Sequence, residues 1–306
     1  MALESPRPFR LPLAPVTSLP EVTRDPGAPR VPTGIPDFDF LTGGLPVGSV
    51  VLLIGEPGAG HQEFALTSAV HLMLHYDDPR LHQFFLGTAK GPFAYPKAVT
   101  YISVTRSQEQ VLQEVGGSFE GSYPDVLRRH VKFHDLSPTY FADSVVPPTW
   151  SSVRSPLLLG TGPKRGANGT DPLKSLADAM EEDGQDNLLI VDSLTDLLVR
   201  SGVEPDGLLT LLKGLRRRAK EWGGVVYLLL SRGVAPLAVE QALIDSVDGV
   251  LSFSWTTSPS HSHRQRVMLI EKFMSVLSRV PHEHQGRFVI RISALSGLVT
   301  TQYERI

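Results

Sequence analysis

A glycine-rich turn between an apolar run and a helical pattern constrains the fold of this 306-residue chain more than any other feature. Residues 50–54 read Val-Val-Leu-Leu-Ile, a run of apolar residues typical of a buried strand. The turn that follows contains three glycines among six residues: Gly55, Glu56, Pro57, Gly58, Ala59 and Gly60. Apolar residues then recur between Phe64 and Leu74, which predicts a helix. Strand, glycine-rich turn and helix in this order predict a phosphate-binding loop, since glycines let backbone N–H groups turn toward an anion.

The two positions after the last glycine depart from the phosphate-loop pattern G-x-x-x-x-G-K-[ST]. His61 stands in place of the Lys that contacts the β- and γ-phosphates, and Gln62 in place of the hydroxyl that holds Mg²⁺. A histidine has a pKa of about 6.5 and is only partly charged near neutral pH. The sequence therefore predicts a loop with its backbone cradle but without its reactive side chains. The alternative is an ordinary strand-to-helix turn that binds nothing.

Composition excludes several classes of protein. The apolar fraction of 41% is that of a globular chain, and a formal net charge of -3 provides no overall basic field for nucleic acid. The absence of cysteine excludes disulfides and thiolate chemistry. No apolar run is long enough to span a bilayer, and the N-terminus lacks the plan of a signal peptide. We therefore expect a cytoplasmic protein without a membrane partner.

Two segments differ from the rest in composition. Residues 1–31 carry seven prolines, which predicts an extended N-terminal arm, and we expect residues 32–306 to form a single domain. Residues 137–172 are rich in Pro, Ser, Gly and Thr and predict a long loop or insertion within that domain.

Residues 32–49, directly before the turn, carry the resemblance to a known family. They read Pro-Thr-Gly-Ile-Pro-Asp-Phe-Asp-Phe-Leu-Thr-Gly-Gly-Leu-Pro-Val-Gly-Ser. This block resembles the lead-in T-G-h-x-x-h-D-x-h-h-x-G-G-h-P-x-G-S (h, apolar) of RecA-superfamily ATPases, in the branch of KaiC, the gas-vesicle regulator GvpD and archaeal recombinase paralogues. Asp39 falls near the acidic position of that pattern. The resemblance implies an α/β fold with a RecA-like P-loop NTPase core: a mostly parallel twisted sheet flanked by helices, with a C-terminal antiparallel hairpin.

Two further strands match the family and differ from it in chemistry. In active relatives the strand that corresponds to residues 98–104 ends in a Glu that activates water, but here Thr105 and Arg106 follow. An arginine cannot accept a proton near neutral pH. The strand at residues 188–191 ends in Asp192 and resembles the Walker B segment, whose carboxylate orients Mg²⁺. A structural Asp192 that caps the next turn is the alternative.

The C-terminal third continues the resemblance. The strand predicted at residues 224–232 ends in Ser231 and Arg232, and either could take the place of the polar residue that senses the γ-phosphate in relatives. Residues 266–275 match the strand R-x-L-x-I-x-K-x-R-G, in which Lys272 would reach a neighbour's nucleotide, although Met274 replaces the following Arg. His261 and His263 lack acidic or thiol neighbours, so we expect a hairpin tip and no metal site. The remaining predicted elements are strands 131–134 and 247–255, helices 107–115, from about 205, and 239–246, and a closing hairpin of 286–292 with 297–299.

These residues predict a protein without catalytic residues. We expect a catalytically inactive RecA/KaiC-like protein that acts as a regulatory or assembly subunit in signal transduction, without a cofactor and with weak ATP binding or none. Its partners would be copies of itself or related RecA/KaiC-like subunits. One alternative is an ATPase with an atypical P-loop. Another is a nucleic-acid-associated subunit, either a recombination mediator or an Elongator-like accessory that binds tRNA. The net charge does not indicate nucleic acid, but a basic cluster at residues 213–220 leaves it open.

Overall fold

The computed structural model describes residues 29–86, 93–121, 123–142, 144–151, 171–200, 202–257, 264–280 and 286–302. Its strands are β1 (Arg30–Val31), β2 (Leu45–Pro46), β3 (Ser49–Gly55), β4 (Val99–Ser103), β5 (Val131–Asp135), β6 (Leu188–Asp192), β7 (Val225–Ser231), β8 (Gly249–Thr257), β9 (Arg264–Lys272), β10 (Arg287–Ser293) and β11 (Gly297–Gln302). Its helices are α1 (Pro36–Thr42), α2 (His61–Asp77), α3 (Pro79–Leu86), α4 (Gln108–Ser118), α5 (Tyr123–His130), α6 (Ser137–Tyr140), α7 (Pro148–Ser151), α8 (Pro172–Asp183), α9 (Leu194–Val199), α10 (Pro205–Trp222), α11 (Leu237–Ser246) and α12 (Met274–Leu277).

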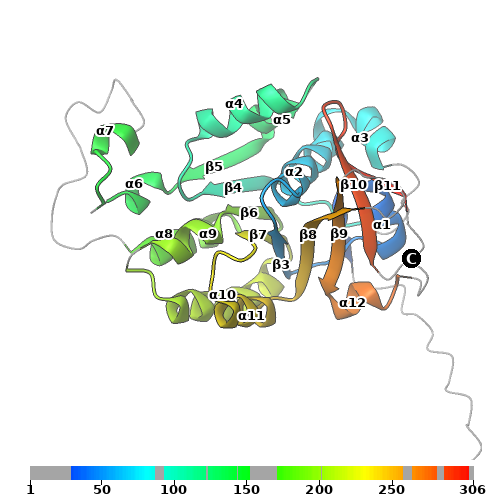
Figure 1. The fold of residues 1–306 in the computed structure, drawn as a ribbon. Coiled ribbons are helices and arrows are strands. Elements are labelled where there is room, and N and C mark those ends of the chain that lie inside the picture. Colours follow the sequence, from blue (N-terminus) through cyan, green and yellow to red (C-terminus); the bar gives the residue numbers. More distant parts are fainter. Residues whose placement is uncertain are drawn as a thin grey trace, which may run out of the picture.

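A nine-stranded sheet forms the centre of the fold, in the order β11-β10-β9-β8-β3-β7-β6-β4-β5 (Figure 1). The strands from β8 to β5 pair in parallel, and β9, β10 and β11 add to the β8 edge in antiparallel pairs. This arrangement confirms the predicted α/β fold, with its mostly parallel sheet and its C-terminal antiparallel hairpin. It also places the carboxyl end of β3, where the glycine-rich turn begins, near the middle of the sheet.

Helices cover both faces of the sheet, with α2, α4 and α5 on one side and α8 to α11 on the other (Figure 1). The alternation along β3 explains its unbroken apolar run, because Val51 and Leu53 join the core of the first side while Leu52 and Ile54 join that of the second. A parallel strand buried on both faces needs apolar residues at every position. Among the described residues, no helix combines the length and the apolar character that a bilayer crossing needs.

Local signals set the ends of the helices. Ser107 caps α4 in a reciprocal capping box with Gln110. Pro205 begins α10, and Gly223 ends it in the left-handed conformation at φ 74°. These signals explain why the predicted helices at residues 107–115 and from about 205 are confirmed as α4 and α10.

Three expectations for secondary structure need correction. Residues 137–172 are not a continuous loop, since α6 and α7 lie within them and α8 begins at Pro172; residues 152–170 lie outside the described residues. The strand predicted at 266–275 ends at Lys272, because Phe273 turns its ring onto Gly249 and α12 follows. Arg30 and Val31 are not part of an arm but pair with β2, whereas residues 1–28 lie outside the described part of the chain, as do His261 and His263.

One buried carboxylate, that of Asp39, organises the segment 32–49 that carries the family resemblance. Asp39 accepts hydrogen bonds from the backbone N–H of Thr33 and Gly34 at 2.8 Å each and from the Thr33 hydroxyl at 2.9 Å. Burial raises the pKa of Asp39 to about 7, although these hydrogen bonds oppose the shift. Gly34 has φ 78°, and a Cβ there would lie 2.8 Å from the Cβ of His71 on α2. Thr33, Gly34 and Asp39 therefore have a structural role: they hold this segment in place by hydrogen bonds and by close contact with α2.

Replacing Asp39 with alanine is expected to lower the free energy of unfolding by about 2–4 kcal/mol, because the buried donors of Thr33 and Gly34 would lose their acceptor. Asp37, an exposed carboxylate on the same helix, provides the matched control, and Asp37→Ala should cost under about 1 kcal/mol. Urea unfolding measures both. Equal losses in the two variants would contradict the role assigned to Asp39.

Candidate functional site

The glycine-rich turn adopts a tight conformation between β3 and α2. Gly58 and Gly60 have φ of 69° and 117°, a region that other residues rarely adopt. The N–H of Ala59 donates to the carbonyl of Glu56 at 3.0 Å, which closes the turn. A Cβ at Gly60 would lie 2.9 Å from the side chain of Ile290 on β10. The turn leads directly into the N-terminus of α2, where free backbone N–H groups favour an anion.

Side chains from β8 and β9 hold the turn from outside. The indole N–H of Trp255 donates to the carbonyl of Pro57 at 3.2 Å, and Nε of Arg266 donates to the carbonyl of Gly58 at 2.8 Å. The guanidinium groups of Arg264 and Arg266 lie 4.7 and 4.4 Å from the ring centroid of Trp255. The C-terminal strands therefore help to shape the turn.

His61, the first residue of α2, does not supply the charge of the missing Lys. Its ring lies against Gly55, since a Cβ there would lie 2.4 Å from Nδ1 of His61. That nitrogen is buried and has no hydrogen-bond partner. Burial lowers the pKa of His61 below its usual value, although Asp192 partly opposes the shift. The ring is therefore neutral at neutral pH and packs as part of the turn's support.

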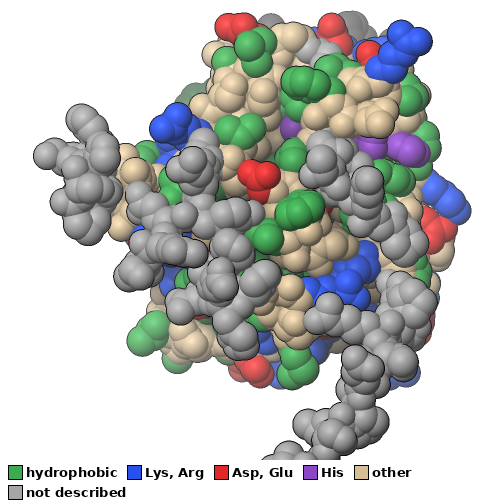
Figure 2. All heavy atoms as spheres, turned by 90° about the vertical axis from the view of Figure 1, so that its right-hand side faces the viewer, with side chains coloured by type: hydrophobic (Ala, Val, Ile, Leu, Met, Phe, Trp, Pro, Cys, Tyr) green, Lys and Arg blue, Asp and Glu red, His purple; other side chains and the backbone are tan. Residues whose placement is uncertain are grey.

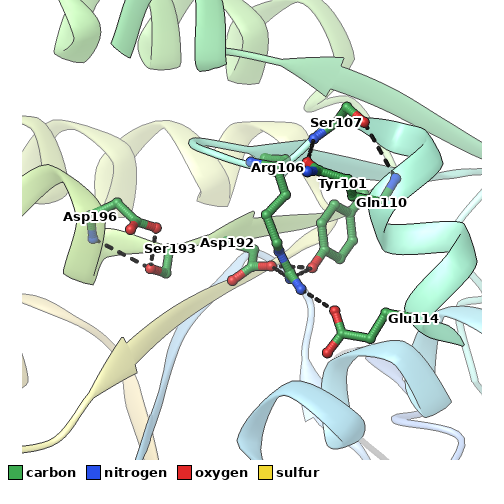
Figure 3. A network of polar contacts seen from close by, with 9 residues as sticks. Tyr101, Arg106, Ser107, Gln110, Glu114, Asp192, Ser193 and Asp196 are labelled. Carbon is green, nitrogen blue, oxygen red and sulfur yellow. Dashed lines mark hydrogen bonds and ion pairs between the residues drawn. The ribbon is translucent and has the colours of Figure 1, made fainter. Parts of the chain in front are cut away.

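Arg106 supplies the cation of this site. Its guanidinium forms an ion pair with Asp192 and a second one with Glu114, and it donates to the hydroxyl of Tyr101 at 3.1 Å (Figure 3). The amide group of Gln62 lies against the same guanidinium. Its oxygen is assigned to the side that faces Arg106, because in that orientation it accepts from Nη1 at 2.9 Å and both groups have a partner. Figure 3 shows these side chains converging from β4, β6 and α4. A side-chain cation thus fills the space between the start of α2 and Asp192.

One oxygen of the Asp192 carboxylate accepts hydrogen bonds from two side chains. Tyr101 donates its hydroxyl to the same oxygen that pairs with Arg106, and the Asp192 side chain is 12% exposed. Burial and the nearby Asp192 raise the pKa of Tyr101 far above its ordinary value, so its hydroxyl keeps its proton. Burial opposes the charge of Arg106, yet Tyr101 and Asp192 raise its pKa overall. The guanidinium of Arg106 therefore keeps its positive charge beside Asp192.

The fold brings this network together from distant parts of the chain. Ser103 on β4 lies opposite Asp192 on the neighbouring parallel strand β6, and the N–H of Arg106 donates to the hydroxyl of Ser103 at 3.0 Å. Sequence reasoning singled out Asp192 and noted Arg106 only as the loss of a base. It missed Tyr101, whose only signal is a polar group within an apolar strand, and Glu114, one of several polar residues on a helix.

The other two predicted site residues lie apart from this network. Ser231 ends β7 beside Gly55, and its backbone N–H donates to the hydroxyl of Thr195 at 2.8 Å. Lys272 is the last residue of β9. Its ammonium donates to three carbonyls at the end of α11, those of Ile244, Asp245 and Val247, at 2.9, 2.9 and 2.8 Å. Lys272 therefore caps a helix of its own chain, and a role across a subunit interface stays a prediction.

A second cluster of possible metal ligands lies between β5 and α8, away from the turn. Ligand atoms of His134, Glu182 and Asp183 lie within 4.8 Å of one another. Lys132 donates to Glu182 at 2.7 Å and to Asp183 at 3.0 Å, so an ammonium already pairs with both carboxylates.

Comparisons with known proteins identify the fold. No family model and no curated protein sequence matches the chain. Among solved structures, it resembles the flagellar accessory protein FlaH from Methanocaldococcus jannaschii, with 16% identity and a TM-score of 0.58, and a KaiC-like protein from Pyrococcus horikoshii OT3, with 17% identity and a TM-score of 0.58. Each alignment covers 90% of this chain and all of the other. The chain therefore has a RecA/KaiC-like fold.

The pKa of His61 is expected to fall below 6.5 in the folded protein, because burial disfavours the charged ring. In an Asp192→Asn variant it should fall further, since the carboxylate that favours protonation is lost. A pH titration of the imidazole resonances by NMR measures both values, and His61→Gln identifies the resonance by its disappearance. A midpoint at or above 6.5 in the wild type would contradict a buried neutral ring.

Proposed function

We propose that this chain is a catalytically inactive RecA/KaiC-like protein that acts as a regulatory or assembly subunit in signal transduction. It works through contacts with proteins and binds nucleotide weakly or not at all. One observation carries the proposal. Arg106 stands where the family resemblance places a catalytic carboxylate, and its guanidinium pairs with Asp192, the residue that would orient Mg²⁺.

The residues around the turn do not fit the Mg·ATP that a RecA-like fold implies. His61 offers a neutral ring in place of a Lys, and the amide oxygen of Gln62 already faces Arg106. The carboxylate of Asp192 is bound by Arg106 and Tyr101. A metal ion there would face a fixed positive charge, which repels it.

The missing groups argue against hydrolysis. Removing one charge-stabilising group from a phosphoryl-transfer site typically costs about 10³–10⁵ in rate. This chain lacks the P-loop Lys, the Mg²⁺-binding hydroxyl and the carboxylate that activates water. Such losses overlap and cannot be multiplied, but a single one leaves little turnover.

Exposed apolar side chains support a role in binding proteins. Phe40 on α1 is 63% exposed, and Met274 on α12 is 88% exposed. Met274 also takes the place of the Arg that, in the family, reaches a neighbouring subunit. An apolar side chain exposed at that point suits contact with another protein. The flagellar neighbour is itself described as an accessory protein.

The nucleic-acid alternative receives less support from the surface. On α10, the cations Arg216 and Lys220 pair with Asp248, and Arg218 pairs with Glu181 and Glu221. On the face that Figure 2 shows, basic, acidic and apolar side chains of the described residues are interspersed. A nucleic-acid site would instead need a continuous basic surface.

The wild-type chain is expected to release no phosphate from Mg·ATP above background. The double variant His61→Lys, Gln62→Thr should remain at background, because Arg106 still pairs with Asp192 and no carboxylate replaces the missing base. A phosphate-release assay measures both. Turnover in the wild type that disappears in Asp192→Ala would instead establish an ATPase with an atypical P-loop.

Self-association is expected, because the fold resemblance implies assembly and Met274 exposes an apolar side chain at the corresponding edge. Sedimentation velocity over a range of concentrations should show species larger than a monomer. Met274→Glu should shift the chain toward the monomer. Monomeric wild type at every concentration, alone and mixed with a KaiC-like partner, would contradict the assembly role.

A further inference from the structure

The guanidinium of Arg106 lies in a cage made of oxygen atoms. Its nitrogens contact a carboxylate oxygen of Asp192, a carboxylate oxygen of Glu114 and the hydroxyl of Tyr101, and the amide oxygen of Gln62 faces them. These four residues come from β6, α4, β4 and α2 (Figure 3 shows the first three). Carboxylate, amide and hydroxyl oxygens are the donors that hard divalent cations such as Mg²⁺ and Mn²⁺ prefer.

We propose that Arg106 is a built-in replacement for the divalent metal, so that Asp192 holds a guanidinium permanently and this chain binds no metal ion there. The inference rests on the proposed function, in that both assign no Mg·ATP reaction to the turn. It goes further in two respects: it names Arg106 as the group that occupies the metal position at Asp192, and it states that removing Arg106 would let a divalent cation bind there.

Entropy favours the fixed cation over a bound one. Asp192 and Glu114 provide two negative charges, and Arg106 neutralises one of them without loss of binding entropy, since it belongs to the same chain. Asp192 is 12% exposed and Glu114 is 55% exposed, so the pair with Asp192 carries most of the interaction.

The same contacts let Arg106 hold neighbouring elements of the fold together, as a bound metal ion would. A planar guanidinium presents five N–H donors in a fixed arrangement and can join several oxygens at once. Here it links the start of α2 to β4, β6 and α4 through the four side chains of the cage. Removing it leaves a cluster of oxygens, two of them charged, with no cation among them.

The experiment compares Mn²⁺ binding to four proteins, by calorimetry and by thermal unfolding, without nucleotide: the wild type, Asp192→Asn, Arg106→Gln, and Arg106→Gln with Asp192→Asn. We expect no Asp192-dependent binding in the wild type. Arg106→Gln should bind one Mn²⁺ per chain, and Mn²⁺ should raise its melting temperature by roughly 2–4 °C. The added Asp192→Asn should abolish both effects. Any Mn²⁺ held by the cluster of His134, Glu182 and Asp183 is common to all four proteins and cancels in the comparison.

Two results would overturn the inference. One is Mn²⁺ binding by the wild type that disappears in Asp192→Asn; the other is a folded Arg106→Gln protein that gains no Mn²⁺ site. Should Arg106→Gln fail to fold, the comparison of wild type with Asp192→Asn still decides whether Asp192 holds a metal. Because no nucleotide is present, these outcomes are independent of the phosphate-release assay. Hydrolysis by a wild type without an Asp192 metal site would contradict the proposed function alone.

Discussion

The ion pair between Arg106 and Asp192 is the interaction on which the candidate site depends. Two charges removed from water are stable only when each has a partner and further hydrogen bonds. Tyr101 supplies a hydrogen bond to the same Asp192 oxygen, and Gln62 places its amide oxygen beside the guanidinium. Once formed, the pair uses the carboxylate that a RecA-like site would offer to a metal, and it places a cation where such a site needs a base.

The glycine-rich turn keeps its tight conformation without a bound phosphate, because its residues pack against the hydrophobic core. The ring of His61 lies on Gly55, and a Cβ at Gly60 would collide with Ile290 on β10. Trp255 and Arg266 hold carbonyls of the turn from outside. Substituting these glycines would therefore disturb the core whether or not a phosphate binds, so the shape of the turn is by itself no evidence for nucleotide chemistry.

Much of the fold could be predicted from local patterns. The buried strands β3, β6 and β7 are unbroken apolar runs, and the capping box at Ser107 and the proline at Pro205 set the starts of α4 and α10. The same reasoning failed where polar residues dominate. The helices α6 and α7 lie in a region predicted as loop, because helices of four residues give a weak periodic signal. The structural neighbours agree with the predicted fold, and the inactive chemistry stays a proposal.

The amino-acid sequence by itself determined which reactive groups this chain lacks, because a lysine, a hydroxyl or a carboxylate at a given position depends on no other part of the molecule. Tertiary structure alone decided what the remaining groups do. Arg106 and Asp192 are 86 residues apart in sequence and meet because β4 and β6 pair in parallel with Ser103 opposite Asp192. Burial of the His61 ring and capping of α11 by Lys272 likewise depend on which elements pack together, since neighbours set the charge and contacts of a side chain.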